Sequence, residues 1–176
     1  MFILGIDPGT ADTGYGIVEK VGNTPKIIAY GSIKTSSKLS SGERLAQIYD
    51  RLSALIDTYH PDVMVVEKLF FAKNERTALA VGRTIGVVLL CAAQKKLEIV
   101  EYAPNEIKQA VVGYGAADKQ QVQYMVARIL GLKETPKPDH AADALALCIC
   151  YAHSAKLRSL SIKEPKSRQK GKDVDD

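Results

Sequence analysis

Two short apolar segments, each ending in an acidic residue, constrain the fold of this chain more than any other feature. Residues 2–7 read Phe-Ile-Leu-Gly-Ile-Asp, and residues 62–67 read Asp-Val-Met-Val-Val-Glu. Apolar runs of this length are typical of strands buried inside a sheet. In α/β proteins, ligand sites collect beyond the carboxyl ends of such strands. We therefore expect Asp7 and Glu67 to converge at one edge of a sheet if their strands are neighbours.

The segments around these two strands predict an α/β protein in which helices flank a mixed five-stranded sheet. Residues 14–19 and about 26–35 read as strands that form an antiparallel meander with the first, and residues 98–102 as a fifth strand. Ser40 and Glu43 have the spacing of a capping box, which places a helix start there. Further helices are expected at residues 75–95, from Pro104 onward, at 118–130 and at 138–156.

Length and charge predict one folded domain with a basic tail. A chain of 176 residues with 46% hydrophobic residues can bury one sizeable core. We place one folded domain at residues 1–157 and a disordered tail at 158–176. From Lys156 onward, seven basic residues face four acidic ones, so most of the net charge of +4 lies near the C-terminus. A claim of nucleic-acid binding therefore has to rest on a local basic surface.

The composition also predicts a cytoplasmic protein. The first residues carry no basic, leader-like segment, and the apolar stretch at residues 86–93 is too short to cross a bilayer. The three cysteines lack the C-x-x-C spacing of a zinc site. Their apolar surroundings indicate buried thiols in a reducing compartment.

The start of the last predicted helix supplies further candidate ligands. His140 and Asp143 are three residues apart, so both can face one direction from a single turn; Asp139 and Asp143, four apart, are the competing pair. The helix is apolar on all sides, so periodicity does not choose between Asp139 and His140.

Acids gathered in one pocket repel one another unless cations neutralise them. Mg²⁺ prefers oxygen ligands, and two such ions can drive phosphodiester hydrolysis. A histidine can serve as a ligand or as a proton shuttle, and Mn²⁺ tolerates it better than Mg²⁺. Taken singly, Asp7 or Asp139 could equally be a turn or helix cap, whereas Glu67 closes a buried strand and needs a charged partner.

Four segments, in this order along the chain, resemble the motifs of the RuvC Holliday-junction resolvase family. They are residues 5–16 (Gly-Ile-Asp-Pro-Gly-Thr…Thr-Gly-Tyr-Gly), 66–74 (Val-Glu-Lys-Leu-Phe-Phe-Ala-Lys-Asn), 112–119 (Val-Gly-Tyr-Gly-Ala-Ala-Asp-Lys) and 139–146 (Asp-His-Ala-Ala-Asp-Ala-Leu-Ala). The resemblance runs from Phe2 to about Ser154. It implies a ribonuclease-H-like fold and a homodimeric, Mg²⁺-dependent endonuclease that cuts four-way DNA junctions symmetrically in recombination and repair.

By position in these motifs, the metal-binding catalytic set is Asp7, Glu67, His140 and Asp143. The resemblance further implies that Phe70 stacks on unpaired bases, with Phe71 as the alternative, and that Lys73, Arg76, Lys108 and Lys119 meet the DNA backbone. Surface lysines on helices are often merely solvated, which is the competing interpretation for Lys108. The family works with the branch-migration proteins RuvA and RuvB.

Three other functions are compatible with parts of the sequence. The opening motif also resembles the phosphate-binding start of actin-like and heat-shock-protein ATPases, but those proteins need two such lobes and this chain has room for one. A nuclease of the same fold that acts on structured RNA, as the YqgF-like proteins do, is the nearer alternative. A junction-binding protein without activity is disfavoured because all candidate ligands are present. Gly82 and Gly86 would allow a helix to approach a partner helix, or the protein's own sheet, closely.

Overall fold

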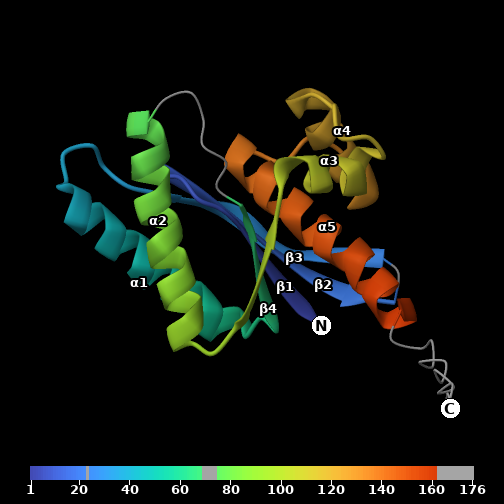
Figure 1. The fold of residues 1–176 in the computed structure, drawn as a ribbon, viewed down its shortest axis with the longest axis horizontal. Coiled ribbons are helices and arrows are strands. Elements are labelled where there is room, and N and C mark those ends of the chain that lie inside the picture. The colour runs from blue at the N-terminus through green and yellow to red at the C-terminus, as the bar shows by residue number, and fades with distance from the viewer. Residues whose placement is uncertain (23, 69–74, 162–176) are drawn as a thin grey trace, which may run out of the picture.

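The centre of the protein is a five-stranded mixed sheet (Figure 1), seen in a computed structural model that describes residues 1–22, 24–68 and 75–161. Its order is β3-β2-β1-β4-β5, formed by β1 (Phe2–Asp7), β2 (Asp12–Val21), β3 (Thr24–Lys34), β4 (Val63–Glu67) and β5 (Glu98–Tyr102). β1, β2 and β3 pair antiparallel, whereas β4 runs parallel to both β1 and β5. The predicted meander and mixed sheet are thus confirmed, with β2 longer than predicted because its pairing with β3 continues to the turn.

Helices cover both faces of this sheet. They are α1 (Ser41–Tyr59), α2 (Glu75–Gln94), α3 (Pro104–Val112), α4 (Lys119–Ile129) and α5 (Asp139–Ser161). The predicted capping box is present: the Ser40 amide donates to the Glu43 carboxylate at 2.8 Å, and the Glu43 amide donates back to the Ser40 hydroxyl. α5 continues to Ser161, past its predicted end at Lys156. Within the described ranges, none of the helices has the length and hydropathy needed to span a membrane.

Alternate side chains of the buried strands pack into two separate hydrophobic cores, one on each face of the sheet. Ile3, Val63 and Val65 pack beneath α3, α4 and α5, whereas Leu4 and Met64 pack beneath α1 and α2. A strand that is apolar on both faces gives a continuous hydrophobic run, which explains the opening sequence pattern. The sheet therefore has two covered faces, and its carboxyl edge is left for polar groups.

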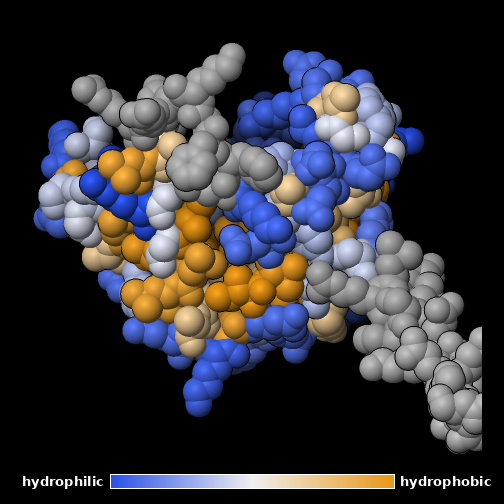
Figure 2. Space-filling view, viewed as in Figure 1, coloured by the Kyte–Doolittle hydropathy of each residue, from blue (hydrophilic) through white to orange (hydrophobic). Residues whose placement is uncertain are grey.

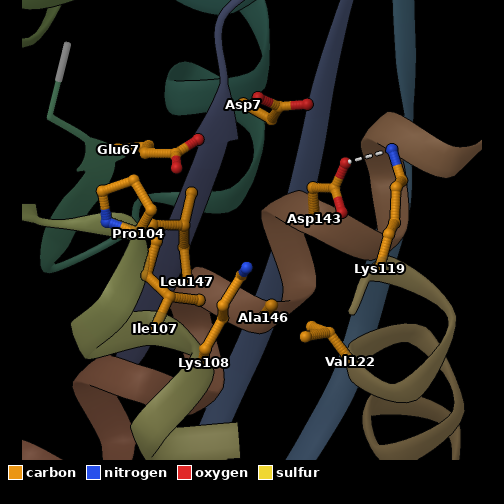
Figure 3. A pocket seen from close by; sticks show the side chains of 10 residues that line it. All are labelled: Asp7, Glu67, Pro104, Ile107, Lys108, Lys119, Val122, Asp143, Ala146 and Leu147. Atoms are coloured by element: carbon orange, nitrogen blue, oxygen red, sulfur yellow. Dashed lines mark hydrogen bonds and ion pairs between the residues drawn. The ribbon is translucent and has the colours of Figure 1, made fainter. Parts of the chain in front are cut away.

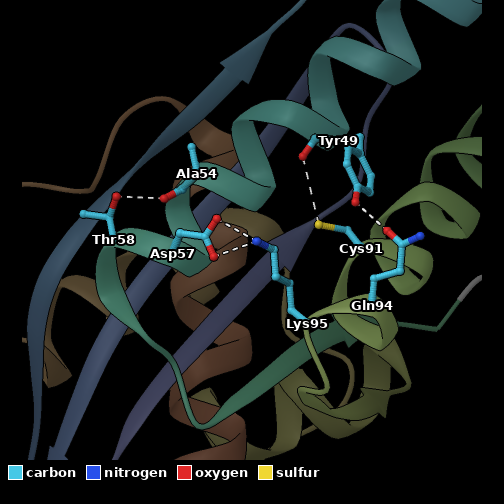
Figure 4. A network of polar contacts seen from close by, with 7 residues as sticks. All are labelled: Tyr49, Ala54, Asp57, Thr58, Cys91, Gln94 and Lys95. Atoms are coloured by element: carbon cyan, nitrogen blue, oxygen red, sulfur yellow. Dashed lines mark hydrogen bonds and ion pairs between the residues drawn. The ribbon is translucent and has the colours of Figure 1, made fainter.

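On one face, α1 and α2 are joined by polar contacts (Figure 4). The Lys95 ammonium lies 2.6 Å from both carboxylate oxygens of Asp57, and the Tyr49 hydroxyl donates to Gln94. The hydrogen bond to Asp57 is the main reason that the pKa of Lys95 is raised. These contacts fix the position of α2 against α1.

On the other face, α5 lies unusually close to β1 and β2 because glycines line the contact. A Cβ atom at Gly14 would lie 2.0 Å from the carbonyl oxygen of His140, and one at Gly5 would lie 2.1 Å from that of Ala144. No side chain fits in either space. The glycines thus set how deeply the first turns of α5 enter the edge of the sheet.

Candidate metal and nucleic-acid site

Asp7 and Glu67 end two neighbouring parallel strands, as the sequence predicted. Ile6 pairs with Val66 in the last step of the β1–β4 register, so the two acids follow at the same level of the sheet. Both line a pocket of about 220 Å³, with Asp143 on its rim (Figure 3). Sites for drug-sized ligands are usually about 300–1,000 Å³. The pocket therefore suits ions and a phosphate group better than a whole nucleotide.

The first turn of α5 brings two further groups to Asp7. Nδ1 of His140 lies 2.7 Å from Oδ2 of Asp7, at hydrogen-bonding distance. Asp7, His140 and Asp143 each offer a ligand atom within 4.8 Å of the others. Glu67 lies in the same pocket but outside this group of three. The structure thus brings three of the four predicted ligands together and places the fourth beside them.

The structure places His140 rather than Asp139 next to Asp7 and Asp143, a choice that helix periodicity left open. Gly14 pairs with Asp7 in the β1–β2 register and also underlies the carbonyl of His140, so it holds the imidazole next to that carboxylate. The Asp139 side chain is exposed, and its Oδ2 lies 3.9 Å from the Lys119 ammonium. His140, and not Asp139, shares the cluster with Asp7 and Asp143.

Burial and mutual repulsion disfavour the charged forms of these acids. Burial is the largest cause of the raised pKa of Asp7; its hydrogen bond to His140 acts in the opposite direction. The pKa of Glu67 is raised to about 7, first by burial and then by the negative charges of Asp7 and Asp143. A bound cation would reverse this balance and keep the carboxylates ionised. The donor set therefore has the electrostatics of a cation site.

Two lysines supply positive charge on the side of the pocket away from the strands. Lys119 donates to Asp143 at 2.9 Å, whereas Lys108 rises from α3 toward the space below Glu67 (Figure 3). Burial lowers the pKa of Lys119, but the hydrogen bond to Asp143 and the nearby carboxylates outweigh it and raise the pKa overall. Lys108 is half-buried and lines the same pocket as the acids, and its contact with the DNA backbone stays a prediction.

The start of α4 fixes where Lys119 emerges. Asp118 caps this helix by accepting from the Gln121 amide at 2.8 Å, and the Gln121 side chain accepts from the Asp118 amide in return. The Tyr114 hydroxyl also donates to Gln121 at 2.7 Å. Lys119, the first residue of α4, therefore extends from a well-anchored helix end.

Sequence reasoning missed the anchoring of the turn that follows Asp7. The Thr10 hydroxyl donates to the Ala80 carbonyl at 3.1 Å and lies 2.9 Å from the hydroxyl of Thr84, a fully buried residue of α2. The signal was a lone threonine on the apolar side of a helix, because a buried hydroxyl needs a hydrogen-bond partner.

Three predicted DNA contacts are not placed by the structure. Phe70 and Lys73, together with the alternative Phe71, lie outside the described residues, as does the side chain of Arg76. Their roles remain predictions from sequence.

The strand order, the helices on both faces and the carboxylate cluster at the sheet edge define a ribonuclease-H-like α/β protein with a candidate metal site. The family model of crossover junction endodeoxyribonuclease RuvC matches residues 3–151. The RuvC protein of Alkaliphilus metalliredigens is 54% identical over 91% of this chain and 98% of its own length. That of Halothermothrix orenii is 54% identical over 89% of this chain and 95% of its own length. The chain belongs to the RuvC family.

Solved structures agree with this assignment. A structure of Thermus thermophilus RuvC in complex with a Holliday junction substrate superposes with a TM-score of 0.85 at 36% identity, covering 90% of this chain and 97% of that one. The yeast mitochondrial Holliday junction resolvase, at 14% identity and a TM-score of 0.62, shares the fold. The predicted ribonuclease-H-like class is therefore confirmed.

Proposed function

We propose that this protein resolves four-way DNA junctions by hydrolysing one phosphodiester bond in each of two strands, with Asp7, Glu67, His140 and Asp143 as its metal-binding catalytic set. The observation that carries the proposal is the convergence of Asp7, His140 and Asp143 within 4.8 Å, in a chain of the RuvC family. As a member of this family, the protein is a crossover junction endodeoxyribonuclease. Its substrate follows from relatives that carry this name and from the Thermus thermophilus complex.

The donor set fits a divalent cation. Carboxylate oxygens are the ligands that Mg²⁺ prefers, and the imidazole makes Mn²⁺ a suitable substitute. Two ions per site follow from the family resemblance, and Asp7 and Glu67 line both the main pocket and a second hollow beside it. When bound, the cations supply the positive charge that stabilises the transition state of phosphodiester hydrolysis.

The protein's own side chains orient the reaction. Nδ1 of His140 lies 2.7 Å from Oδ2 of Asp7, so this contact fixes the orientation of the imidazole beside the carboxylate. Lys108 and Lys119 provide ammonium groups on the open side, where a phosphate of the scissile strand would enter. The Glu67 carboxyl has a pKa of about 7, so a small electrostatic change is enough to ionise it. These groups bind and align the phosphate, and the acids keep the cations in place.

We further propose that the protein works as a homodimer formed through α2. Leu79 and Leu90 on this helix are 60% and 54% exposed, and Gly86 lies between them with open space around it. Figure 2 shows apolar side chains gathered over α2 and toward β5. Two symmetric cuts need two active sites, which C₂ symmetry supplies.

The remaining assignments follow the family resemblance. They are a nuclease domain at residues 1–157, whose last helix runs on to Ser161, a basic tail predicted at 158–176, a cytoplasmic location, and partnership with RuvA and RuvB.

Asp7→Asn tests the catalytic proposal. The variant should bind a synthetic mobile four-way junction in metal-free buffer as wild type does, because its binding surface is intact. With Mg²⁺ or Mn²⁺ it should cut at least about 100-fold more slowly, because a ligand charge is lost. His140→Ala should lose cutting in the same way. Normal cutting by Asp7→Asn would overturn the mechanism.

The substrate is tested separately, by comparing a four-way junction, linear duplex and structured RNA. Paired nicks in the junction alone are expected. Preferential cleavage of RNA would favour the YqgF-like alternative, and turnover of ATP would favour the ATPase lobe.

A further inference from the structure

Lys119 lies between two carboxylates of one helix turn. Its Nζ is 2.9 Å from Oδ2 of Asp143 and 3.9 Å from Oδ2 of Asp139. The side chains of Lys119, Asp143 and Asp139 are 52%, 30% and 64% exposed, so the ammonium sits closest to the more buried acid. The lysine therefore neutralises a carboxylate that also belongs to the proposed metal cluster.

This position conflicts with a divalent cation. A cation on Asp143 and an ammonium on the same carboxylate would repel each other at close range. The lysine stem is flexible, and its base is fixed by the capped start of α4. Asp139 is the second carboxylate that pairs with Lys119 in the described part of the chain, and closing its distance to that of the Asp143 contact requires a movement of about 1 Å.

We propose that in the metal-free protein the Lys119 ammonium occupies the place of a cation on the Asp143 carboxylate. When a divalent cation binds Asp143, the Lys119 ammonium moves to Asp139. The inference rests on the metal site proposed above. Asp139 is then a positioning residue: it acts through Lys119 and does not bind the metal. Because Asp139 lies on the same helix turn as Asp143, it keeps the displaced ammonium beside the pocket that Lys119 lines, where the phosphate enters.

Metal binding without DNA tests the first half. Free Mn²⁺ can be followed by electron paramagnetic resonance while the full-length protein is titrated. Lys119→Met should bind Mn²⁺ about two- to fivefold more tightly than wild type, because the ion no longer has to break the Lys119–Asp143 ion pair. This factor corresponds to the usual strength of a solvent-exposed ion pair. Lys119→Arg keeps the charge and should bind as wild type does. Lys108→Met removes a charge from the same pocket without this ion pair and should change the affinity less than Lys119→Met does.

A double-mutant cycle tests the second half. In the wild-type background, Asp139→Asn should weaken Mn²⁺ binding about two- to fivefold, because the displaced ammonium has lost its second acceptor. In the Lys119→Met background, the same substitution should change neither the Mn²⁺ affinity nor the rate of junction cleavage at saturating metal. When Lys119 is present, Asp139→Glu should bind Mn²⁺ as tightly as wild type does.

The outcomes separate the two proposals. If wild type binds no Mn²⁺, or binds it as well after Asp7→Asn, the metal site fails and this inference fails with it. If Asp7→Asn abolishes binding but Lys119→Met binds no more tightly, the proposed role of Lys119 alone is refuted. If Asp139→Asn weakens binding equally in both backgrounds, Asp139 is a ligand or a general charge and not a partner of Lys119.

Discussion

Gly14→Ala is the sharpest perturbation of the site that leaves every polar side chain in place. Gly14 lies between Asp7 and His140: it pairs with Asp7 in the sheet and lies beneath the carbonyl of His140. The added Cβ would lie 2.0 Å from that carbonyl oxygen, whereas ordinary contact begins at 3.4 Å. The first turn of α5 and β2 must therefore separate by about 1.4 Å.

The size of this shift sets two expected magnitudes. Overfilling a packed interior costs about 1–3 kcal/mol, and each kcal/mol lowers the melting temperature of a chain of this size by about 2–4 °C. The same shift would stretch the 2.7 Å contact between His140 and Asp7 beyond hydrogen-bonding distance. A misplacement of about 1 Å in an active site can lower the rate about 100-fold.

The assay is junction cleavage well below the melting temperature of the variant, with melting followed by circular dichroism. Gly42→Ala is the matched control, because that position in α1 has open space and needs no unusual backbone angle. It should melt and cut as wild type does or melt slightly higher. If Gly14→Ala melts and cuts normally, the close contact is wrong. If it melts lower but cuts at the wild-type rate, the contact does not position the site.

Two further predictions concern pH and assembly. Burial raises the pKa of Glu67 to about 7, so between about pH 4.5 and 7 the metal-free folded protein binds more protons than the unfolded chain. The free energy of unfolding should therefore fall by up to about 3 kcal/mol as the pH rises through this window. Denaturant unfolding should show this loss, and Glu67→Gln should remove most of it; an unchanged slope would show that another group titrates. The paired change Leu79→Glu and Leu90→Glu should convert a dimer into a monomer in sedimentation, whereas Val21→Glu, another exposed apolar position, should not. A dimer that survives the paired change would place the interface elsewhere.

The strand-end acids could be predicted because the signal is local. An apolar run that ends in an acid reports both the burial of a strand and the emergence of a polar group at its end. Asp7 and Glu67 lie at one edge because β1 and β4 are parallel neighbours, the condition on which the prediction depended.

The choice of His140 over Asp139 could not be made from the helix itself. α5 is buried on most of its surface, so its periodicity marks no single face. The orientation of its first turn is set by contacts that are distant in sequence, with Gly14 below it and Lys119 beside it. A family motif contains this information, whereas a single helix pattern does not.

Lys119 illustrates a second limit. Its motif indicated a contact with DNA, but the ion pair with Asp143 depends on how α4 crosses α5. Such crossings arise from tertiary packing and leave little trace in local residue spacing. The capping residue Asp118, by contrast, was readable as a helix start at 118.

The glycines beneath α5 also limit how this protein can change over time. The atom nearest to an added Cβ at Gly5 or Gly14 is a backbone carbonyl oxygen, which no side-chain substitution can remove. Sequence drift should accordingly proceed on the outer surfaces of α1 and α4 while this seam stays fixed. Attempts to retune the nuclease by directed evolution will find more usable variation in the residues that line the mouth of the pocket than in the strands that support it.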